Sequence, residues 1–390
     1  MIGVVLANTL HTVMPGLDPG IHGMPLAQTT DFSTGGTAWM PGSSPGMTVV
    51  GRGGATVRLV LGLIVVAVIC LTGQTAHAGR LEQIKARGYL GCGVYPGVAG
   101  FATVKDGRYS GFDTDICRAV AAAIFGTPEK IKFTEVATVD GFRKNAAVDM
   151  AVRRLTWTLT RETPLGLMFG PIVYYDGQGF LVPKSAGIAS ARQLAGKRIC
   201  VDPGEGWAGN LGRYSTANQL ALNSVLVPSR AAGEERLFGG QCDAYSADKT
   251  MLGAIRSDAA RPQDYAILPE QISKEPLAPL VRQGDDRFFQ VVRWTVFALI
   301  EAEELGVTSQ NIEEKRSSSD PDTRSLIGVA PGNGKALGLS EHWAADAISA
   351  VGNYGELFER NIGSASGIGL ERGLNKLWTN GGLMYAPPLR

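Results

Sequence analysis

Short apolar runs and longer amphipathic stretches take turns along residues 88 to 137. Residues 88–95, GYLGCGVY, and residues 131–137, IKFTEVA, have the length and composition of buried strands. Between them, residues 113–125 place apolar side chains at helical spacing, and Gly126 follows as a stop. Asp113 and Thr114 are residue types that cap helices, so we expect one of them at the helix start. The order predicts a strand–helix–strand unit.

The same alternation restarts after residue 190. Residues 190–204 predict a helix, a turn and a strand, and residues 224–229 and 242–248 predict two further strands. Helical patterns at 210–223 and 233–241 separate these strands. This order predicts two α/β units in tandem, joined by an extended segment that ends in a loop.

A long helix is predicted after Asp285 or Asp286, either of which can cap it. Its apolar side chains repeat at helical spacing, which favours a place in the core: Phe288, Phe289, Val292, Val296, Phe297, Leu299 and Ile300. About 85 residues follow, too few for a third unit, so we expect the chain to return to the first lobe. We therefore assign residues 79–182 plus 276–390 to lobe 1 and 183–275 to lobe 2, joined by two crossover segments that form a hinge.

The N-terminal region has a different composition. Residues 1–57 are rich in Gly, Pro, Ser and Thr, and MPGLDPGIH at 14–22 recurs as MPGSSPGMT at 40–48. We interpret this region as a repetitive leader, either disordered or translated from DNA upstream of the true start. Residues 58–78 begin at Arg58, continue as an apolar run and end in Ala-His-Ala, which predicts a secretory signal peptide cleaved after Ala78. The apolar run is shorter than the roughly 20 residues of a bilayer span, which disfavours a retained anchor.

Charge and histidine content exclude several functions. The chain of 390 residues has 37 Lys and Arg against 36 Asp and Glu, evenly mixed, so nucleic acid and anionic membranes are not expected partners. After cleavage His342 is the one histidine left, and a histidine-based triad or multi-histidine metal site is hard to build. We expect no catalytic residues and no metal site.

Four cysteines remain in the exported chain, an even number that predicts two disulfides with three possible connectivities. Cys92 lies near Cys117 in the sequence, and Cys200 lies near Cys242. Local pairing would place one bridge in each half, so we expect Cys92–Cys117 and Cys200–Cys242.

From residue 79 to the end, the chain resembles the periplasmic solute-binding proteins of amino-acid ABC transporters, family 3 type, and most closely the general L-amino-acid subfamily. The resemblance rests on GFDTDICRAVAAAIFG, TWTLTRET, YYDGQGFLV, CDAYSADK, ILPEQISKEPLAPLVRQGDD, VRWTVFALIEAEELG, VGNYGELFERNIG and GGLMYAPPLR. It implies the α/β, two-lobed type II fold, a periplasmic location and a free L-amino acid as ligand. It also implies a monomer without a cofactor that serves ABC permease subunits, and the chain itself has no nucleotide-binding P-loop motif.

The resemblance also implies a ligand site. A T-x-T-x-x-R element holds the amino acid's α-carboxylate in this family, and Thr156, Thr158 and Arg161 match it, with Trp157 between the threonines. A guanidinium suits a carboxylate because it donates two parallel hydrogen bonds. A surface ion pair is the alternative role for Arg161.

The α-ammonium is assigned to the other lobe. Family members place an aspartate at the end of a D-A-x-x-x-D strand, and Asp248 holds that position here. Its alternative role is to cap a helix that starts at Lys249. Opposite charges on two lobes explain closure, since both ends of the ligand are satisfied only when the lobes meet.

This chain departs from its close relatives near that site. They have Ser-Arg-Asn-Thr where it has Val152–Leu155, which adds a charge, and Tyr95 and Val98 stand where many use an acid and an aromatic residue. We expect Arg153 and Arg154 to influence which ligand side chains are accepted.

A second departure replaces Gly-Thr-Thr-Thr of the relatives by Gly204-Glu205-Gly206-Trp207. The glycines permit backbone amides to approach a carboxylate closely, whereas Glu205 repels one unless it points away or pairs with Arg153 or Arg154. The departures predict an altered ligand preference.

Two other classes use the same fold. In an exported enzyme similar to cyclohexadienyl dehydratase, Glu205 or Asp248 would serve as general acid or base. In a sensory module, the ligand-bound form would dock to a membrane receptor.

Overall fold

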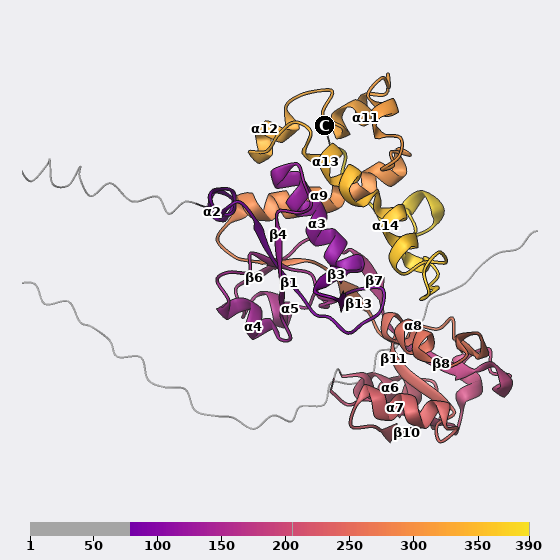
Figure 1. Ribbon diagram of the computed structural model, residues 1–390. Coiled ribbons are helices and arrows are strands. Elements are labelled where there is room, and N and C mark those ends of the chain that lie inside the picture. The colour runs from indigo at the N-terminus through magenta and orange to yellow at the C-terminus, as the bar shows by residue number, and fades with distance from the viewer. Residues whose placement is uncertain (1–78, 205, 390) are drawn as a thin grey trace, which may run out of the picture. The chain divides into compact units, whose positions relative to one another are not determined.

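Two five-stranded sheets organise residues 79–204 and 206–389, which are the residues that the computed structural model describes (Figure 1). The expectations for the leader, the signal peptide and Glu205 lie outside the described residues. No helix within the described ranges is both long and apolar enough to cross a membrane.

The first sheet has the strand order β4-β1-β5-β14-β6. Its strands are β1 (Leu90–Val94), β4 (Ile131–Glu135), β5 (Met150–Ala151), β6 (Leu167–Phe169) and β14 (Leu280–Arg282). β1 pairs in parallel with β4 and β5, whereas β14 runs antiparallel to both β5 and β6. β14 follows the whole second sheet in the sequence and lies between β5 and β6 of the first sheet.

Helices from both ends of the chain cover this sheet and share its core. They are α2 (Arg80–Arg87), α3 (Phe112–Phe125), α9 (Asp286–Glu304), α13 (Trp343–Val351) and α14 (Tyr354–Asn361). α3 packs against α13 and α9, with fully buried Phe112, Val120 and Ile348 in one hydrophobic cluster. The carboxylate of Asp285 accepts from the Phe288 amide at 2.8 Å, so Asp285 is the cap of α9.

The expected cap of α3 is wrong. Gly111 occupies the cap position, and neither Asp113 nor Thr114 precedes the helix. The Thr114 hydroxyl instead donates back to the Gly111 carbonyl at 2.8 Å, which uses it inside the first turn. Gly111 has φ 125°, and a Cβ there would lie 2.3 Å from the Phe101 carbonyl oxygen, so only glycine fits.

The second sheet has the order β10-β9-β11-β8-β12. Its strands are β8 (Gln178–Pro183), β9 (Arg198–Val201), β10 (Asn223–Leu226), β11 (Ala244–Asp248) and β12 (Tyr265–Ile267). β9 pairs in parallel with β10 and β11, and β8 pairs antiparallel with β11 and β12. Helices α6 (Trp207–Ala217), α7 (Arg230–Phe238) and α8 (Lys249–Asp258) pack on these strands.

The hinge is a pair of short antiparallel strands. β7 (Tyr174–Asp176) leads into the second sheet, β13 (Glu275–Leu277) leads back, and Asp176 lies opposite Glu275. The two expected crossovers are therefore adjacent and hydrogen-bonded to each other. The second sheet begins at Gln178, and the assignment of residues 183–275 to lobe 2 stays a prediction.

Short elements complete the fold. They are the hairpin of β2 (Thr103–Lys105) and β3 (Arg108–Ser110), then α4 (Val139–Lys144), α5 (Leu159–Glu162), α10 (Ile312–Lys315), α11 (Pro321–Leu326) and α12 (Asn333–Leu337). Single 3₁₀ turns occur at Lys184–Ala186, Ala191–Leu194, Pro262–Asp264, Gly373–Asn375 and Trp378–Asn380.

Both expected disulfides are confirmed. Cys92–Cys117 joins β1 to α3, and Cys200–Cys242 joins β9 to the residue pair that precedes β11. Each bridge therefore lies inside one lobe, and neither crosses the hinge.

A segment of the C-terminal region also touches the hinge and the second lobe. Residues 363–375, which we call the strap, follow α14 of the first lobe. The Arg256 guanidinium of α8 donates to the carbonyls of Ile368 and Gly369 at 2.6 and 3.0 Å. The Asn375 side chain accepts from the Tyr175 amide at 2.7 Å and donates to its carbonyl at 3.2 Å, in strand β7. The strap thus links both lobes and one hinge strand, which sequence analysis did not foresee.

Candidate functional site

A cavity of about 320 Å³ is lined by residues of both lobes. Tyr95, Arg153, Arg154 and Arg161 contribute from the first lobe, and Trp207 and Asp248 from the second. The predicted carboxylate-binding arginine and the predicted ammonium-binding aspartate therefore line the same space.

Arg161 is positioned by the two threonines that precede it. Thr158 caps the short helix α5, because its hydroxyl accepts from the Arg161 amide at 3.2 Å. The Arg161 guanidinium donates to the Thr156 carbonyl at 3.1 Å. The Thr156 hydroxyl donates to Glu275 of the hinge at 2.6 Å. The threonines thus orient Arg161, and neither is among the residues that line the cavity.

Trp157 points elsewhere. Its ring stacks on Phe169 at a centroid distance of 6.0 Å, and its indole N–H donates to Glu162 at 2.8 Å. The side chain does not line the cavity.

Asp248 ends strand β11 and occupies the cap position of α8, but its carboxylate makes no capping hydrogen bond. It accepts instead from the indole N–H of Trp207, at 2.9 Å. Burial raises the pKa of Asp248 well above its ordinary value, and the nearby carboxyls of Asp176 and Glu275 raise it further. The Trp207 hydrogen bond and Arg154 act in the opposite direction. The carboxyl of Asp248 thus lines the cavity without serving as a helix cap.

The glycine segment of the second lobe lies beside the cavity wall. The Gly204 amide donates to the Asp202 carboxylate at 2.8 Å, so that donor is already used, and Asp202 itself lines the cavity. Gly206 has φ 82° and precedes α6, a backbone conformation that favours glycine. A carboxylate cradle at Gly204 and Gly206 stays a prediction.

Arg153 and Arg154 face different partners. Arg153 donates to the carbonyls of Val136 and Ala137 at 2.9 and 2.7 Å, with its guanidinium 5.4 Å from the Tyr95 ring centroid. Arg154 donates to the hydroxyl of Thr250 in α8 at 3.5 Å. Arg154 therefore reaches across from the first lobe to the second.

Two buried carboxyls lie close to these arginines. Asp113 is 2% exposed, and its Oδ2 has no hydrogen-bond partner in the part of the chain that the structure describes. Burial raises the pKa of Asp113 to about 7 against the opposing effect of Arg154 and Arg153. Asp176 accepts from the Thr250 hydroxyl at 2.5 Å and from the Gly177 amide at 2.8 Å, and burial raises its pKa to about 6.

Comparison with known proteins identifies the family of this chain. The model of the bacterial extracellular solute-binding proteins, family 3, matches residues 90–314. The chain belongs to this family. The match spans both sheets and the hinge, while α11 to α14 and the strap lie beyond it.

Named members of the family are similar over almost their whole length. The general L-amino acid-binding periplasmic protein AapJ of Rhizobium johnstonii is 43% identical over 338 residues, 85% of this chain and 99% of that protein. The glutamate/glutamine/aspartate/asparagine-binding protein BztA of Rhodobacter capsulatus is 46% identical over 329 residues, 83% of this chain and 97% of that protein. A solved structure, an ABC transporter periplasmic binding protein from Brucella ovis with glutathione bound, is 46% identical with a TM-score of 0.74, covering 80% of this chain and 100% of that one.

Sequence reasoning about this family 3 protein missed one residue that joins the lobes at the cavity. Arg230, at the start of α7, donates to the Gly97 carbonyl of the first lobe at 3.1 Å and forms ion pairs with Glu234 and Asp258. It lines the cavity. An arginine in the first turn of a helix is common on protein surfaces, so the sequence carries no signal for this role.

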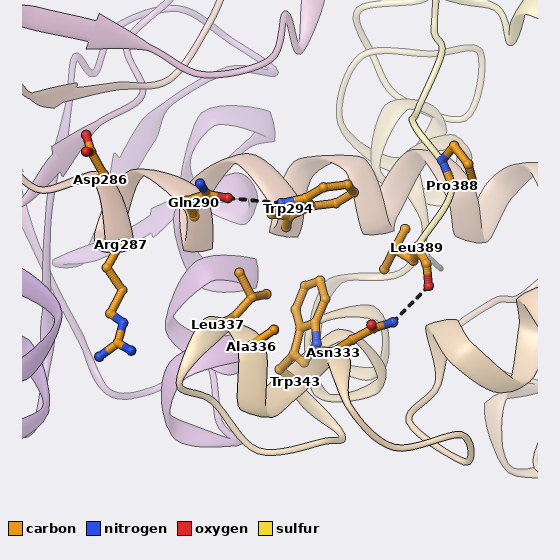
Figure 2. Close-up of a pocket in the computed structure, with 10 residues that line it drawn as sticks. All are labelled: Asp286, Arg287, Gln290, Trp294, Asn333, Ala336, Leu337, Trp343, Pro388 and Leu389. Carbon is orange, nitrogen blue, oxygen red and sulfur yellow. Dashed lines mark hydrogen bonds between the residues drawn. The ribbon is translucent and has the colours of Figure 1, made fainter.

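A second cavity of about 400 Å³ lies beside α9, with Trp294, Leu337, Trp343 and Leu389 in its wall (Figure 2). The Asn333 side chain of α12 donates to the Leu389 carbonyl at 2.8 Å, which fastens the C-terminal segment there. None of the predicted ligand-binding residues lines this cavity.

Proposed function

We propose that this family 3 protein is a periplasmic receptor that captures a free L-amino acid between its lobes and delivers it to the permease of an ABC transporter. The observation that carries the proposal is one cavity with Arg161 on one lobe and Asp248 on the other. The names of AapJ and BztA support the ligand class and the location. The receptor acts as a monomer after removal of its signal peptide.

Capture follows from where the two charges lie. Arg161 donates two parallel hydrogen bonds to the α-carboxylate, while Asp248 accepts from the α-ammonium. Because each lobe satisfies one end of the ligand, the ligand binds the closed arrangement more tightly and shifts the protein toward it. The chain has no P-loop, so the energy for transport comes from the ATPase of the partner transporter.

A ligand larger than one amino acid is the second candidate. Among the residues that the structure describes, four arginines line the cavity against two aspartates, Asp202 and Asp248. Glutathione, which is bound in the similar Brucella ovis structure, has a free α-amino-acid group and a second carboxylate. Arg161 and Asp248 would hold the former, and Arg153, Arg154 or Arg230 would attract the latter.

Calorimetric titration of residues 79–390 against the twenty amino acids and glutathione tests both candidates. Arg161→Ala or Asp248→Ala should each weaken binding by roughly 2 to 5 kcal/mol, because the surviving ligand charge is left buried and unpaired. Arg161→Lys should rescue little, since an ammonium does not reproduce the two parallel bonds. Arg143→Ala, which removes an exposed ion pair with Asp140 in the same lobe, should bind normally.

Ligand analogues that lack one of the two charges test whether both are required. An amino-acid amide or a deaminated acid should fail to bind the unmodified protein. If a ligand without an α-ammonium bound as tightly as its parent, the site would be in the wrong place. Turnover of a prephenate-like substrate would favour the dehydratase alternative instead.

A further inference from the structure

Arg154 has an unusual backbone conformation for a residue with a long side chain. It follows strand β5 and has φ 52°, in the left-handed region that side chains other than glycine rarely adopt. Such a conformation costs of order 1–3 kcal/mol and persists only where the surroundings hold it. The surroundings of the guanidinium therefore indicate what Arg154 does.

The Arg154 side chain ends at the junction of the two lobes and the hinge. Its Nη1 donates at 3.5 Å to the hydroxyl of Thr250, two residues after Asp248. That hydroxyl in turn donates to Asp176 of hinge strand β7 at 2.5 Å. One chain of hydrogen bonds thus runs from the first lobe through α8 to the hinge.

The position is unfavourable for a cation unless carboxylates compensate. Thr250 lies in the first turn of α8, and the N-terminal end of a helix carries partial positive charge. The compensating groups are Asp248, Asp176 and Asp113, and Arg154 lowers the pKa of all three carboxyls against the effect of their burial.

Arg154 is the cation that lowers the pKa of Asp248. Asp176 on β7 and Glu275 on β13 face it with like charge, and Trp207 on α6 offers a neutral donor. The hydroxyls of Thr156 and Ser273 donate to Glu275. Within the described residues, no ion pair with Asp248 is formed.

We propose that Arg154 is a positioning residue of the ammonium site: its charge holds Asp248 and the hinge residue Asp176 in their ionised forms together, so that Asp248 presents a carboxylate to the ligand. This inference rests on the proposed capture of an amino acid and goes beyond it.

The sign of the pH effect follows from the charges. Removal of the Arg154 charge raises the pKa of Asp248, and the protonated carboxyl no longer attracts an ammonium. A variant without the Arg154 charge should therefore bind the amino acid at high pH and lose affinity as the pH falls. The pH at which half of the affinity is lost should be higher than in the unmodified protein. An opposite charge lowers the pKa of a carboxyl, so we expect the midpoint to shift upward when the Arg154 charge is removed.

Carbon-13 NMR of the aspartate carboxyls in the ligand-free protein measures the pH midpoints at which Asp248 and Asp176 titrate. The variants Asp248→Asn and Asp176→Asn assign the signals. Arg154→Gln and Arg154→Gly should raise the titration midpoints of Asp248 and Asp176. Because glycine readily adopts the left-handed backbone conformation, Arg154→Gly removes the charge without straining the fold. Arg154→Lys should restore most of the shift. Arg143→Gln is the control, since it removes an exposed charge of the same lobe that pairs with Asp140.

Titration calorimetry with L-glutamine, whose side chain is neutral, gives the functional readout between pH 5 and 8.5. The midpoint of its affinity should rise in Arg154→Gln and not in Arg143→Gln. Unchanged carboxyl midpoints in both charge-removing variants, or equal shifts in Arg143→Gln, would overturn the inference. Because the NMR measurement needs no ligand, a failure of amino-acid binding would contradict the proposed function while leaving the role of Arg154 measurable.

Discussion

At the scale of single residues, the indole N–H of Trp207 is the direct donor to the Asp248 carboxylate. Trp207→Phe keeps an aromatic ring at this buried position but removes the donor. Hydrogen bonds to charged groups contribute about 1.5–3 kcal/mol, so amino-acid affinity should fall about tenfold or more. Calorimetry measures the loss. Trp294→Phe removes an indole donor beside the other cavity and should leave affinity unchanged; an equal loss there would contradict the assignment.

The sequence predicts the two charged residues of the site better than it predicts the residues that contact them. Arg161 and Asp248 were reached through a motif and a strand end, and the structure brings both to one cavity. Trp157 lies within the motif, and the structure stacks its ring on Phe169. Trp207 and Arg154 act on Asp248 from other parts of the chain. Such contacts depend on tertiary packing, which local patterns do not contain.

At the scale of elements, two glycines inside helices make a matched pair. A Cβ on Gly233 of α7 would lie 2.0 Å from the Tyr245 ring of β11, whereas nothing lies within 4 Å of one on Gly212 of α6. Gly233→Ala should lower the free energy of unfolding by about 1–3 kcal/mol, because the helix must move off the sheet. Gly212→Ala should raise it by about 0.5–1 kcal/mol, since alanine loses less backbone entropy. Denaturant unfolding measures both, and equal effects would show that α7 does not need this close approach.

Periodic elements were predicted well, and elements made by pairing were not. β1, α3 and α9 have clear patterns over several residues, and the structure contains each of them. The helix expected at 210–223 ends at Ala217, because Gln219 and Ala221 adopt φ 54° and 49°. The helix expected after residue 190 is a single 3₁₀ turn. β14 has three residues, and its place between β5 and β6 comes from distant partners that no local pattern encodes.

At the scale of the whole molecule, the strap should restrict movement of the lobes about the hinge. Arg256→Ala removes its hydrogen bonds to α8, and Asn375→Ala removes those to β7. Each variant should broaden the distribution of distances between the lobes, measured by spin labels on α4 and α7, because a contact outside the hinge strands is lost. Arg316→Ala, which removes an exposed ion pair with Glu313, is the control. An unchanged distribution in both strap variants would show that β7 and β13 alone set the movement.

The interleaving of the first sheet has a consequence for how the chain folds as it leaves the membrane. The strands of the second sheet lie in one stretch, from Gln178 to Ile267, and can pair as soon as that stretch emerges. In the first sheet β5 and β6 are separated by β14, and Leu280 pairs with Phe169, 111 positions earlier. Until β14 arrives, both neighbours present open strand edges, which are sites of aggregation. The lobe that emerges first is thus the one that closes last, and its newly exported strands need protection from pairing with other chains during that interval.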